Sequence, residues 1–164
     1  MTELYLIRHG LAVERGREVR DQDRPLTEEG RYKTAQIAKR LRQLDLEFEL
    51  IGSSPLVRAA QTAEILLQEG VGKRLDLCEH LAPGGRLEDG LAWLNRSRLP
   101  KAARVALVGH EPDLSAWAER LIWGEVRSVL RLKKAGMIGL MLPDQGSEIG
   151  QTVLFWLTPP KFLL

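Results

Sequence analysis

The sequence predicts an α/β protein, a three-layer α/β/α sandwich with a mostly parallel sheet and an antiparallel edge at its C-terminal end. Residues 4–7 and 105–108 are short continuous apolar runs, typical of strands that are buried on both faces. Residues 114–122 carry apolar side chains at helical spacing, which predicts a helix packed on the sheet. The apolar runs 137–142 and 152–157 are joined by a loop too short for a crossover helix, so we expect them to pair antiparallel.

A helix is expected to begin at Thr27, whose side chain can cap the first turn. Two glutamates in that turn favour the positive end of the helix dipole, and the apolar stripe reaches Leu44. The other expected elements alternate between strand and helix: strands over residues 48–51 and 75–78, and helices over residues 56–69 and 87–94. This alternation is typical of a sheet that is covered by helices on both faces.

The composition is that of an ordinary globular chain, and its 164 residues are expected to form one domain, residues 1–164. A net charge of +2 is too small to favour nucleic acid as a partner. The single cysteine, Cys78, cannot form an internal disulfide, which favours a reducing compartment. No apolar run has the length of a membrane span or signal peptide, so we expect a cytoplasmic protein with no membrane partner.

Polar side chains follow three of the expected strands where each strand ends. Arg8 and His9 follow the first strand, a Ser-Ser-Pro turn leading to Arg58 follows the second, and His110 follows the strand over residues 105–108. Ligands of open α/β sheets bind beyond the carboxyl ends of the strands, so we expect these side chains to share one site. Guanidinium groups and helix N-termini at such an edge favour a phosphoryl group.

Other interpretations of these residues are weaker. The three histidines have no metal-ligand spacing, and arginines at the same edge would repel a divalent cation, so no metal and no cofactor are expected. The mixed-charge segment 14–24 is interpreted as a solvated loop. The four tryptophans are interpreted as packing residues, not as a stacking platform.

Five segments resemble the histidine phosphatase superfamily, also called the phosphoglycerate mutase-like family. Residues 6–10 resemble its Arg-His-Gly signature, and residues 24–30 resemble its Leu-Thr-x-x-Gly element. Residues 54–62 are similar to its second arginine motif, and residues 108–112 to its second histidine motif. The segment Leu-x-Pro-x-Gly over residues 81–85 is similar to the small SixA-like phosphohistidine phosphatases, so the resemblance implies a phosphoglycerate mutase-like fold.

The resemblance implies a metal-independent phosphohydrolase in which His9 is the nucleophile and forms a phosphohistidine intermediate. Arg8, Arg58 and His110 would surround the transferring phosphoryl group. Arg24 is a candidate at the rim of the pocket, and Glu79 is a candidate general acid or substrate-binding residue. The chain departs from larger members, because it lacks both the asparagine after Arg-His-Gly and the helical insertion that carries their acid.

These departures favour phosphohistidine on a partner protein as the substrate. An alkoxide is a poor leaving group and needs an enzyme acid, whereas a protonated imidazole can leave as a neutral group. A site without a covering domain also admits a residue displayed on another protein. Two alternatives remain open: a phosphatase of small phosphomonoesters with the same fold, and a phosphate-binding interaction module without catalysis.

Overall fold

A single mixed sheet organises the computed structural model, which describes residues 1–164. The strand order is β3-β2-β4-β1-β5-β6. The strands are β1 (Glu3–Arg8), β2 (Leu50–Ser53), β3 (Leu75–Leu77), β4 (Arg104–Gly109), β5 (Met137–Met141) and β6 (Val153–Thr158). Pairing is parallel from β3 through β1 and antiparallel between β1 and β5 and between β5 and β6. The expected antiparallel C-terminal edge is therefore confirmed.

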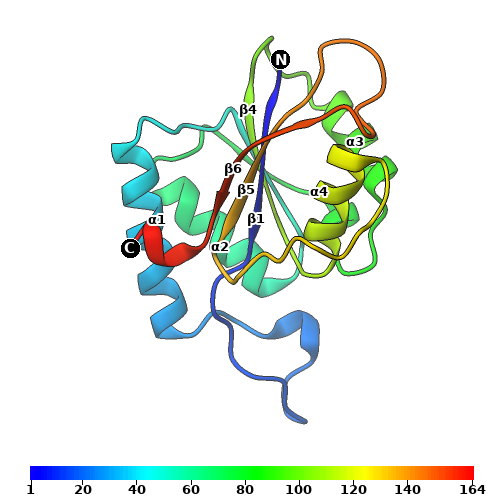
Figure 1. The fold of residues 1–164 in the computed structure, drawn as a ribbon. Coiled ribbons are helices and arrows are strands. Elements are labelled where there is room, and N and C mark those ends of the chain that lie inside the picture. Colours follow the sequence, from blue (N-terminus) through cyan, green and yellow to red (C-terminus); the bar gives the residue numbers. More distant parts are fainter.

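Helices cover both faces of the sheet, as Figure 1 shows. Helices α1 (Glu28–Gln43) and α2 (Val57–Gln68) pack on one face, and α3 (Leu87–Arg96) and α4 (Asp113–Trp123) pack on the other. Alternate residues of β1 enter opposite cores: Tyr5 packs with α1 and α2, and Leu6 packs with α3 and α4. The three-layer sandwich is confirmed. None of the helices combines the length and apolar character that crossing a bilayer requires.

Local signals place the start of α1 as expected. The Thr27 side chain accepts a hydrogen bond from the Gly30 amide at 2.9 Å, which satisfies one of the free donors of the first turn. The other end of the helix differs from the expected stripe. The helix ends at Gln43, so Leu44 lies past the last turn and is 44% exposed.

Strand β2 lies two residues later than its apolar run predicts. Phe48 forms only an isolated bridge, whereas Gly52 and Ser53 continue the ladder beside β4. Glycine and serine are typical of turns, so the sequence pattern ends the strand too early. The consequence is that Ser53 and Ser54 are fully buried at the carboxyl end of the sheet.

Candidate active site

The carboxyl ends of three parallel strands meet at one edge of the sheet. In the register of the central strands, Arg8 lies opposite Gly109, and Ser53 lies opposite Val108. The residues that follow these ends, His9, Ser54 and His110, are therefore neighbours. In Figure 1 this edge lies at the lower end of the sheet, where residues 9–27 leave β1 as a loop.

Four side chains from three separate segments of the sequence line one cavity of about 250 Å³: Arg8, His9, Arg58 and His110. The His9 and His110 rings lie 5.2 Å apart between centroids. Arg58 comes from the first turn of α2, and its Nε lies 3.3 Å from Nε2 of His9. Both histidines and Arg58 are buried. The structure thus brings together the four residues that the strand-end pattern singles out.

The hydrogen bonds of His9 determine its tautomer. Nδ1 lies 2.7 Å from the Gly10 carbonyl oxygen, and because a carbonyl can only accept, Nδ1 must carry the proton. In a neutral ring Nε2 is then unprotonated, and it accepts a hydrogen bond from Nε of Arg58. The Gly10 amide donates to the Thr62 hydroxyl at 3.0 Å, which fixes the backbone that orients the ring. His9 therefore presents a lone pair beside a guanidinium group.

His110 is held by Ser54, for which the strand-end pattern predicts no role of its own. Its Nε2 lies 2.8 Å from the Ser54 hydroxyl, and that hydroxyl accepts a hydrogen bond from the Leu56 amide at 3.2 Å. Nδ1 of His110 is buried without a partner, and so is Nε of Arg8. Two buried nitrogens without partners, on side chains that line the same cavity, are suited to an anion that supplies oxygen acceptors.

Burial keeps both histidines neutral. It lowers the pKa of His9 from 6.5 to about 3; the hydrogen bond to Gly10 opposes this shift, and the nearby positive groups add to it. Burial likewise lowers the pKa of His110 to about 4, and Arg58 contributes to the same direction. A neutral His9 at ordinary pH has the lone pair that nucleophilic attack requires.

The cavity is strongly cationic. Five basic residues line it (Arg8, Arg15, Arg24, Arg58 and Lys134) together with the carboxylates Asp21 and Glu111. Asp21 contacts three of the arginines through its side chain: Arg15 at 3.2 Å, Arg24 at 3.0 Å and Arg58 at 3.3 Å. Burial opposes ionisation of Asp21, but Arg58 and Arg24 outweigh it and lower its pKa. Asp21 therefore remains a carboxylate that orders the arginines.

The segment 14–24 is thus only partly the solvated loop that its mixed charges predict. Most of it is exposed, but residues 21–23 form the 3₁₀ turn η1 (Asp21–Asp23) beside the cavity. The Asp21 backbone carbonyl also accepts a hydrogen bond from Nη1 of Arg58 at 2.7 Å. Charge pattern alone could not identify this contact, because it joins residues 37 positions apart.

The two lower-ranked candidates from the sequence differ in placement. Arg24 lines the cavity and donates to the Val13 carbonyl at 2.8 Å. Glu79 is exposed, begins the 3₁₀ turn η2 (Glu79–Leu81) and does not line the cavity, whereas Pro83 of the same segment does. Glu111, two residues past the end of β4, is a carboxylate that does line the cavity.

Glu111 is occupied by neighbouring donors. One oxygen accepts the Ser115 amide at 3.0 Å, and the other accepts the Ser115 hydroxyl at 2.7 Å and the Leu132 amide. The Leu132 carbonyl in turn accepts a hydrogen bond from Nη1 of Arg8 at 3.0 Å.

No group of three or more histidine, cysteine, aspartate or glutamate side chains that could hold a metal ion is present.

Comparison with known proteins gives consistent results. Residues 4–116 match the family model of the histidine phosphatase superfamily (branch 1). An uncharacterized protein of Picosynechococcus sp. is 47% identical over 163 residues, which cover 99% of each chain. The structure of the protein histidine phosphatase SixA, solved with tungstate, superimposes with a TM-score of 0.83 at 24% identity and covers 99% of this chain and all of that one. A putative alpha-ribazole-5'-P phosphatase from Escherichia coli gives a TM-score of 0.74 at 18% identity, over 98% of each chain.

Proposed function

Because the chain belongs to the histidine phosphatase superfamily, we propose that it removes the phosphoryl group from phosphohistidine on a partner protein, with His9 as the nucleophile and without a metal ion. The match to this superfamily supports phosphatase activity. The proposal adds the nucleophile, the chemical class of the substrate and the roles of the surrounding residues.

The observation that carries the proposal is the tautomer of His9. The Gly10 carbonyl holds the proton on Nδ1, and the unprotonated Nε2 faces the cationic cavity beside Arg58. A module that only binds phosphate needs cationic donors and gains nothing from an unprotonated imidazole nitrogen held beside them. This arrangement therefore favours nucleophilic catalysis over simple binding.

The reaction then takes two steps. Nε2 of His9 attacks phosphorus, the bond from phosphorus to the substrate nitrogen breaks, and the protonated imidazole of the substrate leaves as a neutral group. The phosphorylated ring of His9 keeps its proton on Nδ1, which still donates a hydrogen bond to the Gly10 carbonyl. Water next attacks phosphorus and passes its proton to solvent, and the bond to Nε2 breaks. Arg8, Arg58 and His110 donate to the phosphoryl oxygens throughout.

The carboxylates of the cavity support a nitrogen-linked phosphoryl group as the substrate. An alkoxide leaving group needs a carboxylic acid that donates a proton. Asp21 has a lowered pKa and pairs with arginines, and both oxygens of Glu111 accept hydrogen bonds from Ser115. Neither group is placed as an acid. An imidazole that takes its proton from solvent has no need of one.

The test compares substrates in the presence of a chelator. A phosphohistidine-bearing phosphotransfer domain should be dephosphorylated with a higher kcat/KM than sugar phosphates, and His9→Ala should abolish both activities. A higher kcat/KM for a sugar phosphate would indicate the alternative, a phosphatase of small phosphomonoesters. Binding of inorganic phosphate with no turnover of any substrate would indicate an interaction module. Dependence of the rate on added metal would contradict the proposed chemistry.

A further inference from the structure

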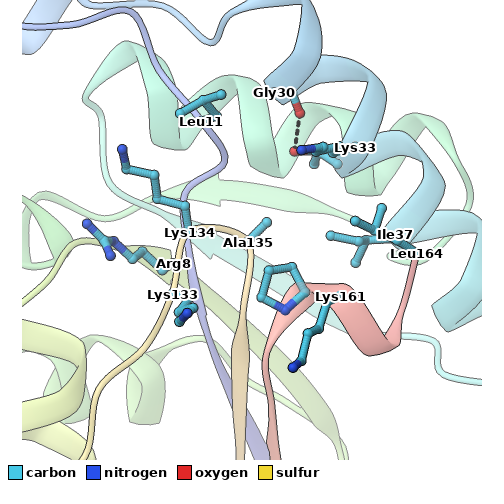
Figure 2. Close-up of a pocket in the computed structure, with 12 residues that line it drawn as sticks. Arg8, Leu11, Gly30, Lys33, Ile37, Lys133, Lys134, Ala135, Lys161 and Leu164 are labelled. Carbon is cyan, nitrogen blue, oxygen red and sulfur yellow. Dashed lines mark hydrogen bonds between the residues drawn. The ribbon is translucent and has the colours of Figure 1, made fainter.

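A second cavity of about 450 Å³ adjoins the active site and has a different character. Arg8 and Lys134 line both cavities, so the two adjoin at these side chains. Figure 2 shows the second cavity between the start of α1, the loop that precedes β5 and the C-terminal 3₁₀ turn η3 (Pro160–Phe162). We call this second cavity the groove. Arg8 lines it, and none of the other residues assigned to the phosphoryl transfer does.

The floor of the groove is apolar. Leu11, Ile37 and Ala135 lie along it, and most of the exposed lining is carbon. Ile37 and Ala135 belong to the core beneath, which makes the floor rigid. A phosphate ion alone gains nothing from such a surface. An apolar side chain that enters the groove would shield this surface from water, which is favourable.

The rim of the groove carries four lysines: Lys33, Lys133, Lys134 and Lys161. They come from three separate segments, as Figure 2 shows, and no aspartate or glutamate side chain lines the groove. Lys133, Lys134 and Lys161 are exposed and form no ion pair, and Nζ of Lys161 lies 4.9 Å from the centroid of the Phe162 ring. Lys33 alone pairs with a carboxylate, the exposed Glu29. Four like charges, three of them without an ion pair, around an apolar floor are complementary to an acidic partner with an apolar anchor.

We propose that this groove is the docking site for an acidic segment of the phosphorylated partner protein, with an apolar side chain on the floor and carboxylates at the lysine rim. This inference rests on the proposed function, because it supplies the second contact of the same substrate. A phosphohistidine bound at His9 would place its flanking residues beside Arg8 and Lys134, where the groove begins. Recognition of those residues would select among partner proteins that carry the same phosphohistidine.

The test uses two synthetic peptides that share one phosphohistidine. One peptide has glutamates and a leucine in its flanks, and the other has glutamines and a serine at the same positions. The docking variant combines Lys33→Glu with Lys161→Glu, two rim positions that do not line the active-site cavity. The control combines Lys39→Glu with Lys101→Glu, which are exposed and outside the groove and cause the same change in net charge.

The docking variant should lose about tenfold in kcat/KM on the acidic peptide, equivalent to about 1.4 kcal/mol, and little on the neutral peptide. The control variant should match the unmodified protein on both peptides. Added salt should reduce the preference for the acidic peptide, because the rim charges are exposed. An equal loss on both peptides, or no loss on either, would overturn the docking site.

Binding of the unphosphorylated acidic peptide separates this inference from the proposed function. Fluorescence anisotropy should detect weak binding that the docking variant loses and the control variant keeps. If that binding is present but neither phosphohistidine peptide is hydrolysed, the docking site stands and the proposed substrate fails. If both peptides are hydrolysed equally and the unphosphorylated peptide does not bind, the substrate class stands and the docking site fails.

Discussion

At the scale of single residues, two neighbouring groups determine which nitrogen of His9 carries the proton and how the ring is oriented. One carbonyl fixes the protonated nitrogen, and one guanidinium lies at the other nitrogen. Because both partners are themselves held, by Thr62 and Asp21, the ring is oriented before any substrate arrives. Such preorganisation lowers the cost of reaching the transition state.

Variants of Arg58 distinguish the effect of its positive charge from the effect of its donor geometry. Arg58→Ala should lower kcat by about 10²–10³-fold, the usual effect of losing one aligned donor to a transition-state oxygen. Arg58→Lys should recover only a small part of that loss, because an ammonium group restores charge but not the planar donors that reach both His9 and Asp21. Steady-state kinetics on a phosphohistidine substrate measures both variants. Full activity of the lysine variant would contradict the geometric role.

At the scale of elements, the segment between α4 and β5 is held by one buried carboxylate. Glu119 is 1% exposed and accepts hydrogen bonds from the backbone amides of four consecutive residues, 127–130. Burial opposes its ionisation, but these amides outweigh that effect and lower the pKa of Glu119. The same segment continues to Leu132, whose carbonyl accepts from Arg8.

Glu119→Ala should therefore destabilise the fold and loosen Arg8. We expect a loss on the order of 3 kcal/mol in the free energy of unfolding, because buried amides lose a charged acceptor. The KM for a phosphorylated substrate should rise more than kcat falls, since Arg8 helps to bind the phosphoryl group. Urea denaturation and steady-state kinetics test the two effects. Glu119→Gln keeps one acceptor oxygen and should show a smaller loss of stability.

The sequence predicts elements better than it predicts the loops between them. Apolar runs and helical stripes predict the strands and helices. The segments that follow the carboxyl ends of the strands bring together four side chains at one edge of the sheet: Arg8, His9, Arg58 and His110. The role of Asp21 could not be predicted, because its contact with Arg58 depends on the path of an irregular loop. In the sequence, Glu119 is one polar residue within a helix that carries an apolar stripe. The spacing of that stripe does not indicate that the amides of residues 127–130 donate to this side chain.

At the scale of the whole molecule, two neutral histidines make stability depend on pH. Their pKa values in the fold, about 3 for His9 and about 4 for His110, lie below the ordinary value of 6.5. As pH falls below 6.5, the unfolded chain takes up protons that the folded protein excludes, so stability is lost. Above 6.5 both states are neutral at these positions and the contribution is fully present.

We therefore expect the free energy of unfolding to fall between pH 6.5 and 4 by up to about 1.4 kcal/mol per pH unit for each of the two histidines. Urea denaturation across this range measures the slope. His9→Asn and His110→Asn should each reduce it, because asparagine does not titrate. An unchanged slope in both variants would show that other groups cause the acid sensitivity.

The central claim is that His9 carries the phosphoryl group during turnover. The most direct measurement is to mix the protein with a labelled phosphohistidine donor in the presence of a chelator, quench the reaction rapidly and locate the label. We expect a phosphoenzyme that is labile in acid and stable in alkali, with the label on His9, and no labelled protein in His9→Ala. Label on another residue, or full turnover by His9→Ala, would contradict it.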